Sequence, residues 1–320
     1  MKGMQLSHIS GKNWWLAAFA LLFATATLVA ASAQDKGTLN PQPLPPLAKP
    51  DDPKTPAKEL FGRRPMPAPP MQSRVIGFYA KGCLAGATAL PINGKTWQVM
   101  RLSRNRNWGH PALVQFLERL SDKGAKQGWR GLLVGDMSQA RGGPMLTGHA
   151  SHQVGLDADI WLTPMPDREL TRGEREEMSA TMVVAQDRRD VDPNVWTPAH
   201  VAIIRTAAED PRVERIFVNP AIKKALCRDA GANREWLHKV RPYWGHDYHF
   251  HVRMRCPADS PDCKPQDPVP PGGDGCGKEL DHWFTDAILH PRPPTTPPKP
   301  RPSLTMADLP AACRQVLLAP

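Results

Sequence analysis

Two short segments of the 320-residue chain contain five of its eleven histidines, interleaved with acidic residues. They cover residues 148–159 and residues 245–253. Imidazole and carboxylate groups are ligands of Zn²⁺, and a catalytic zinc site uses three protein ligands and leaves a fourth position for water. A His-x-His pair alone is weak evidence, because isolated histidines are more often structural. Two histidine-rich segments with interleaved acids together predict a catalytic metal site.

The element that carries the second pair of histidines is predicted to be a strand. Side chains alternate between the two faces of a strand, so His249 and His251 share one face while Phe250 and Val252 point into the core. The first segment enters a strand of its own through a turn at Gly155. One face of that strand is expected to carry Asp157, Asp159 and Trp161.

The N-terminus has the three parts of a secretory signal peptide. Two lysines precede an uncharged run at residues 14–31, which ends in the small-residue sequence Ala-Ser-Ala. An uncleaved membrane anchor is the alternative, because the run approaches the lower length limit of a spanning helix. The cleavage motif favours removal of residues 1–33, so we expect an exported protein with no stable membrane insertion after cleavage.

The charge of the chain is strongly positive. Lysine and arginine number 41 against 31 acidic residues, which gives a formal net charge of +10. Such an excess attracts anionic partners, among them nucleic acid, anionic lipid and acidic cell-wall polymers. Because the signal peptide predicts export, the cell-wall polymer is favoured and nucleic acid is not expected.

The cysteines fit an exported protein. Six are present, and an even number in an exported chain predicts three disulfides, for which 15 connectivities exist. Spacing alone favours only Cys256 with Cys263, which would close a short loop. Because no Cys-x-x-Cys pair occurs, a zinc site built on thiolates is not expected.

Proline divides the chain. The sequence has 36 prolines, and residues 34–72 are predicted to be a proline-rich linker of extended chain without a helix. Residues 287–320 contain a second proline-rich run and are predicted to be a tail tied back to the body through Cys313. Between them, residues 73–286 have the length of one domain.

Helix and strand patterns alternate within that domain. Proline at a first helical position predicts helices that begin at Pro111, at Pro198 and at Pro220. Short apolar runs predict strands at residues 131–135 and 213–218. The predicted fold is α+β, a single domain with a small antiparallel central sheet that carries the zinc site, flanked by helices and long disulfide-tied loops.

The two histidine segments resemble the penicillin-insensitive murein endopeptidases, which belong to a wider group of zinc peptidases that includes lysostaphin-type enzymes and D-alanyl-D-alanine dipeptidases. The segments that carry the resemblance are 151–159 (SHQVGLDAD) and 246–253 (HDYHFHVR). It extends over about 73–286 through the segments 104–111, 135–139, 216–222, 239–242, 255–260 and 273–276. The proline-rich leader and the proline run before Cys313 are less like the family.

The resemblance implies a role for each histidine of the two segments. His152, Asp159 and His251 would hold the catalytic zinc. His249 would lie beside the zinc-bound water or the substrate carbonyl, and His246 would take the other catalytic histidine position.

The resemblance also implies a second metal and a set of disulfides. His149 matches a histidine that can bind a second metal, and Asp187 and Asp190 lie where the family has a D-x-x-H pair, although the last residue here is Asp rather than His. The implied disulfides are Cys83–Cys313, Cys227–Cys276 and Cys256–Cys263.

The function implied is that of a zinc metallo-endopeptidase of the periplasm. Its partner would be peptidoglycan, and it would hydrolyse the D-alanyl–meso-diaminopimelate cross-link, with the link between two diaminopimelates as a second bond. A histidine with a pKa near the ordinary value of about 6.5 would move the proton. Neither Ser-x-x-Lys nor Gly-x-Ser-x-Gly occurs, so the serine mechanism that penicillin blocks is not expected.

Two other functions use the same residues differently. A D,D-carboxypeptidase or dipeptidase would apply the zinc site to uncross-linked stems. A non-catalytic cell-wall-binding protein would use its prolines to span the wall and its positive charge to adhere. Arginines near the motifs could recognise stem carboxylates, although for each a solvated surface charge is the expected state: Arg141, Arg241 and Arg253. The sequence predicts no oligomeric state.

Overall fold

The computed structural model describes residue 34 and residues 36–269, 273–292 and 302–320. The signal peptide predicted for residues 1–33 therefore lies outside the described residues. Among the helices within those ranges, none combines the length and the apolar character that a membrane crossing requires.

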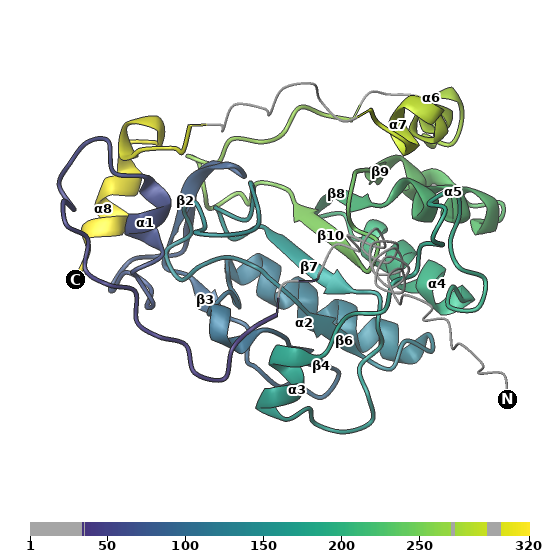
Figure 1. The fold of residues 1–320 in the computed structure, drawn as a ribbon, viewed down its shortest axis with the longest axis horizontal. Coiled ribbons are helices and arrows are strands. Elements are labelled where there is room, and N and C mark those ends of the chain that lie inside the picture. Colours follow the sequence, from purple (N-terminus) through teal and green to yellow (C-terminus); the bar gives the residue numbers. More distant parts are fainter. Residues whose placement is uncertain (1–33, 35, 270–272, 293–301) are drawn as a thin grey trace, which may run out of the picture. The chain divides into compact units, whose positions relative to one another are not determined.

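A six-stranded sheet forms the centre of the domain, in the order β4-β6-β7-β10-β8-β9 (Figure 1). The inner strand pairs are antiparallel, whereas the two outer pairs, β4 with β6 and β8 with β9, are parallel. The α+β class is confirmed, but the sheet is mixed at its edges rather than wholly antiparallel. The strands are β4 (Trp97–Val99), β6 (Leu132–Val134), β7 (Asp157–Trp161), β8 (Val213–Val218), β9 (Val240–Pro242) and β10 (His249–Met254).

One face of the sheet is apolar and the other carries polar residues. The main core lies on one face, where Phe250 and Ile160 pack with apolar residues of α2 (Pro111–Lys126), among them Leu117. The register pairs His251 with Asp159 and Arg253 with Asp157 across β10 and β7. Because side chains alternate along each strand, these four polar residues share the opposite face, as the sequence predicts.

Helices begin where the proline and cap signals place them. Asn219 accepts a hydrogen bond from the backbone of Ala221 at 2.9 Å, and the backbone of Thr197 donates to His200 Nδ1 at 3.1 Å. Proline follows each cap at the first helical position. The further α-helices are α3 (Arg172–Glu177), α4 (Pro198–Ala208), α5 (Pro220–Asp229), α6 (Lys278–Asp281), α7 (Asp286–Leu289) and α8 (Ala312–Leu318).

Short elements complete the fold. Two small antiparallel pairs, β1 with β2 and β3 with β5, lie outside the six-stranded sheet. These strands are β1 (Arg74–Phe78), β2 (Lys81–Ala85), β3 (Thr88–Ala89) and β5 (Trp108–Gly109). The 3₁₀ helices are η1 (Leu102–Arg104), η2 (Glu235–Lys239), η3 (His282–Phe284) and η4 (Met306–Asp308).

The segment before the domain is not all extended chain. A helix, α1 (Ala57–Phe61), lies within residues 34–72, where the sequence predicts none. Phe61 is buried in a second, smaller core with residues of β1 and β2 and with Val316 of α8. Tertiary packing against the C-terminal segment therefore stabilises a five-residue helix that local propensity does not indicate.

Three disulfides connect distant parts of the chain: Cys83–Cys313, Cys227–Cys276 and Cys256–Cys263. These are the pairings that the family resemblance implies. The first joins β2 to α8 across 230 residues of sequence, and it attaches the C-terminal segment to the domain.

Candidate metal centre

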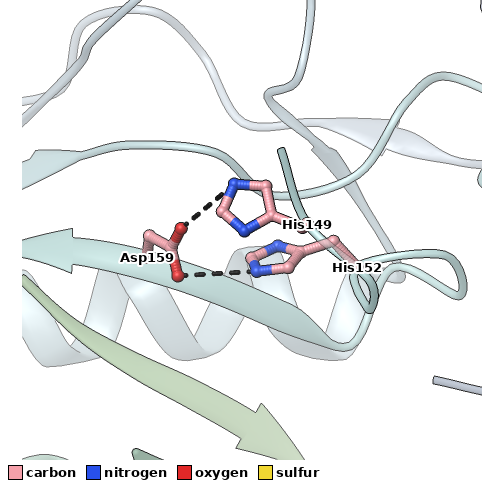
Figure 2. A group of neighbouring side chains, drawn as sticks. All are labelled: His149, His152 and Asp159. Atoms are coloured by element: carbon pink, nitrogen blue, oxygen red, sulfur yellow. Dashed lines mark ion pairs between the residues drawn. The ribbon is translucent and has the colours of Figure 1, made fainter. Parts of the chain in front are cut away.

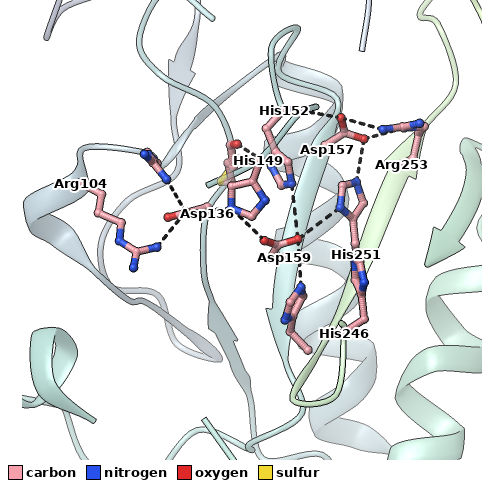
Figure 3. A network of polar contacts seen from close by, with 12 residues as sticks. Arg104, Asp136, His149, His152, Asp157, Asp159, His246, His251 and Arg253 are labelled. Carbon is pink, nitrogen blue, oxygen red and sulfur yellow. Dashed lines mark hydrogen bonds and ion pairs between the residues drawn. The ribbon is translucent and has the colours of Figure 1, made fainter. Parts of the chain in front are cut away.

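Three histidine rings point at one carboxylate oxygen on the polar face of the sheet (Figure 3). Asp159 Oδ1 lies 3.3 Å from His251 Nδ1, 3.5 Å from His152 Nε2 and 3.7 Å from His249 Nε2. Asp159 and His251 come from paired strands, whereas His152 comes from the turn before β7. Asp159, His152 and His251 are the three residues to which the family resemblance assigns the catalytic zinc, and the fold brings them together.

The hydrogen bonds on the far side of two rings decide which nitrogens carry lone pairs. His152 Nδ1 donates to the carbonyl of Met137 at 2.7 Å, and His251 Nε2 donates to Asp157 Oδ1 at 3.0 Å. The other nitrogen of each ring, which faces Asp159, is then an acceptor.

Three acceptors therefore converge without a donor between them. His152 Nε2 and Asp159 Oδ1 are buried and have no hydrogen-bond partner among the described residues. Leaving buried polar atoms unsatisfied costs free energy, and a bound cation would satisfy both of these together with His251 Nδ1. Two imidazoles and a carboxylate suit Zn²⁺, so the donor set fits the predicted ion.

Asp157 holds this arrangement in place. Besides His251, it accepts hydrogen bonds from Arg253 Nε at 2.8 Å and from the backbone N–H of His152 at 3.0 Å. His152 adopts a left-handed backbone with φ of 65°, a strained conformation for a residue with a side chain. Burial alone would raise the pKa of Asp157, but Arg253 and His251 hold that pKa far below its usual value.

A second group of potential ligands shares two members with the first. Figure 2 shows His149 and His152 beside Asp159. The ligand atoms of these three residues all lie within 4.8 Å of one another. His149 Nε2 lies 3.4 Å from Asp159 Oδ2 and 3.0 Å from Asp136 Oδ2. Although burial opposes its charge, the two carboxylates raise the pKa of His149. In this structure His149 is thus a donor to acids, whereas His152 and His251 present lone pairs.

Asp136 connects His149 to two arginines. Arg104 and Arg106 contact Asp136 Oδ2 at 2.9 and 2.7 Å. Burial would raise the pKa of Asp136, but the hydrogen bond from His149 and the two guanidinium groups lower it. Asp136 lies two residues after the end of β6, and the sequence alone does not predict a role for it. Its position after a predicted buried strand, within the segment 135–139 that resembles the family, is the one feature of the sequence that points to it.

The two remaining histidines, His246 and His249, are half-buried and lie close to the group. His249 is paired in register with Trp161, and its Nδ1 is buried without a partner among the described residues. The His246 ring lies 4.8 Å from the His249 ring, and its Nδ1 contacts the carbonyl of Trp244 at 3.0 Å. Burial lowers the pKa of His249 to about 3 and also lowers the pKa of His246. Both shifts favour the neutral imidazole.

The structure does not bring Asp187 and Asp190 to His149. Asp190 instead pairs with Arg228 of α5 at 2.9 Å and with Lys224 at 3.4 Å. Asp187 accepts the backbone N–H of Arg189 at 3.0 Å. Neither belongs to a group of potential metal ligands among the described residues, so this arrangement gives no support to the second metal site.

None of the three arginines near the motifs is a solvated surface charge. Arg141 is 4% exposed and donates to main-chain carbonyls at the C-terminus, among them Val316 at 3.0 Å. Arg253 is buried against Asp157, and Arg241 pairs with Glu279. All three have structural partners, so none is available as the main recognition group for a stem carboxylate.

Comparison with known proteins agrees with this geometry. Residues 75–318 match the family model described as penicillin-insensitive murein endopeptidase. A protein of that name from Haemophilus influenzae is 47% identical over 260 residues, which cover 81% of this chain and 87% of the relative. Namesakes from Klebsiella pneumoniae and Escherichia coli are 47% and 46% identical over 242 and 248 residues, covering 76% and 78% of this chain and 85% and 87% of the relatives.

The polar face of the sheet carries a candidate metal centre, and the family match identifies the chain as a peptidase. With more than half of its length matched and relatives at this level of identity, the chain belongs to the penicillin-insensitive murein endopeptidase family.

Proposed function

We propose that this protein is a zinc-dependent endopeptidase that hydrolyses the peptide cross-links of peptidoglycan in the periplasm, with D-alanyl–meso-diaminopimelate as the bond cleaved. The observation that carries the proposal is the convergence of His152 Nε2, His251 Nδ1 and Asp159 Oδ1, three acceptors with no donor between them. The names of the relatives support murein as the substrate class.

The residues that would hold the ion are His152, Asp159 and His251. When bound there, Zn²⁺ supplies the Lewis acidity that lets water react with a peptide carbonyl near neutral pH. Asp157 fixes the tautomer and direction of His251, as an acid behind a ligating histidine does. The carbonyl of Met137 does the same for His152.

His249 is the proposed proton carrier. Its Nε2 lies 3.7 Å from Asp159 Oδ1, close to where the reacting water and carbonyl would meet. Burial favours the neutral ring, whose free nitrogen can accept a proton and pass it to the leaving amine. The centre of the His246 ring lies 4.8 Å from that of His249. His246 would therefore bind the substrate or take part in the same proton transfer.

The experiment that tests the function is digestion of a purified, cross-linked muropeptide dimer by the mature protein, together with measurement of bound zinc. We expect one zinc per chain and cleavage of the dimer into two stems, abolished by EDTA, restored by Zn²⁺ and unaffected by penicillin. Covalent labelling by penicillin would contradict the proposal.

The products separate the alternatives. A D,D-carboxypeptidase or dipeptidase would release D-alanine or a dipeptide from uncross-linked stems and leave the dimer intact. A wall-binding protein without activity would bind sacculi equally well before and after chelation and would release no product.

A further inference from the structure

A groove separates the N-terminal arm, residues 36–56, from the domain, and nothing in the proposed chemistry uses it. The groove has a volume of about 700 Å³, within the range of about 300–1,000 Å³ that is usual for ligand sites. Pro43 and Leu44 of the arm line one side. The turn that carries Arg104 and Arg106 lines the other, with Leu146.

The arm is fixed to the domain at both ends, so the groove is a built feature. Near its start, Lys36 Nζ donates to Ser179 Oγ at 2.7 Å, and the backbone N–H of Gly37 donates to the carbonyl of Glu176 at 3.0 Å. A Cβ at Gly37 would meet the Glu176 carboxylate, so a larger residue there would require that carboxylate to move. Beyond its far end, the backbone N–H of Ala57 donates to the carbonyl of Leu304 at 2.7 Å. Figure 1 shows the arm as the dark purple segment that leads to α1.

The charge of the groove is positive. Its lining includes Arg63, Arg64, Arg104 and Arg106, and no acidic residue is part of the described lining. Arg63 pairs with Glu59 at 2.8 Å. Arg104 and Arg106 both contact the carboxylate of Asp136.

Arg64 adds a charge that no acid offsets. It is exposed and forms no ion pair with any residue in the described ranges. Guanidinium groups bind carboxylates with two parallel hydrogen bonds, so the Arg64 guanidinium is suited to an anionic ligand.

The groove also adjoins the metal centre. Arg106, in the groove wall, donates to the carbonyl of Thr147 at 2.9 Å and to Asp136 at 2.7 Å. Asp136 in turn contacts His149, which lies 3.4 Å from Asp159. The wall of the groove is therefore linked to the candidate metal centre through Asp136 and His149.

We propose that the groove between the arm and the domain binds the carboxylate-bearing peptide stem of peptidoglycan beside the bond to be cleaved. The proposal rests on the proposed function for the identity of the ligand. Arg64 supplies the unpaired charge for a stem carboxylate, and the prolines and Leu44 supply apolar contact for the alanine methyl groups. The arm lies outside residues 75–318, which match the family model.

The test is calorimetric titration of a soluble, uncross-linked stem tetrapeptide into the full chain. The variants are Arg64→Gln and Leu44→Asp, both at exposed positions where folding should be unaffected. Lys123→Gln, an exposed change of equal charge in α2 outside the groove, is the matched control. We expect the Kd to rise about twofold to fivefold for Arg64→Gln, as for an exposed ion pair, and at least as much for Leu44→Asp.

A second ligand makes the result specific. A stem peptide with amidated carboxyl groups should bind the parent protein and Arg64→Gln with the same Kd, because the charge that Arg64 recognises is gone. The proposal is overturned if Arg64→Gln binds the charged stem as Lys123→Gln does, or if its loss of affinity persists with the amidated stem.

Hydrolysis of the cross-linked dimer separates this proposal from the function it rests on. Arg64→Gln should raise KM and leave kcat unchanged, since Arg64 does not touch the reacting atoms. If no variant or parent protein cleaves the dimer but the binding pattern holds, the endopeptidase proposal fails and the stem-binding groove stands. If cleavage is normal and insensitive to Arg64, only the groove proposal fails.

Discussion

At the scale of single residues, the metal centre depends on which ring nitrogens of His152 and His251 carry no hydrogen. The backbone of Met137 and the carboxylate of Asp157 each take the one N–H of a neutral imidazole, and both free lone pairs then face Asp159. Removing the ring of His152 or His251 would remove a proposed ligand. Removing the ring of His249 would not, because its contact with Asp159 is the longest of the three. The two histidines of the strand β10 should therefore be separable by experiment.

His251→Ala should lose both zinc and activity, because it removes one of three proposed protein ligands. His249→Ala leaves His152, Asp159 and His251 in place, so zinc should be retained while kcat falls by about 10²–10⁴-fold, the range for a lost proton carrier. Bound zinc and muropeptide hydrolysis are to be measured on both variants together. Loss of zinc from His249→Ala with retention in His251→Ala would reverse the assignment.

Asp157→Asn should weaken zinc binding without removing a ligand. The amide can no longer act as an anionic acceptor for both His251 and Arg253, so the ring direction and its basicity change. Losses behind a ligating histidine are typically about 10–100-fold in metal affinity. Competition with a chromophoric chelator measures this, and thermal unfolding of the metal-free protein shows how much of the change comes from Arg253 losing its partner. An unchanged zinc affinity would argue against the role of Asp157.

At the scale of elements, the parts of the fold with a local signal could be predicted. The strand β10 is encoded by strict alternation, and the helices α4 and α5 by a cap residue followed by proline. The helix α1 could not be predicted, because its stability comes from Phe61 packing with a segment some 250 residues later in the chain. Asp136 could not be predicted for the same reason. Its role depends on contacts with His149 and Arg106, which are distant in sequence and leave no periodic pattern.

The helix α5 carries a buried lysine that makes the stability of the fold depend on pH. Lys223 is fully buried and donates to the carbonyls of Leu237 and Asp274. Burial lowers its pKa to about 7, with Arg241 and Arg234 adding repulsion and Asp274 opposing them, whereas an unfolded lysine has a pKa of about 10.4. Between these values the unfolded chain binds more protons, so this group makes the free energy of unfolding rise with pH.

Lys223→Met should remove that dependence. From about pH 7 to pH 10 the parent protein should gain up to about 1.4 kcal/mol per pH unit from this group, and the variant should show a flatter profile whatever its absolute stability. Lys224→Met, at the exposed neighbouring position, is the control and should keep the slope. Denaturant unfolding at a series of pH values measures it, and equal slopes for parent and Lys223→Met would refute the assignment.

At the scale of the whole molecule, the chain is closed by its own C-terminal segment. Cys313 of α8 is joined to Cys83 of β2, and Arg141 donates to the carbonyls of Val316 and Pro320. The helix α1 completes the same small core. This core contains none of the proposed zinc ligands, so stability and chemistry depend on different parts of the molecule.

Replacing Cys83 and Cys313 together by alanine should therefore lower stability and leave the metal centre intact. The disulfide closes a loop with a sequence separation of 230 residues, against 7 for Cys256–Cys263, and in the chain-entropy model longer loops stabilise more. We expect the free energy of unfolding to fall by about 2–5 kcal/mol for the long loop and by less for the Cys256/Cys263 double alanine variant. Zinc content under native conditions should equal that of the parent protein in both. A larger loss from the short loop would show that native contacts near Cys256, and not loop closure, determine what each disulfide contributes.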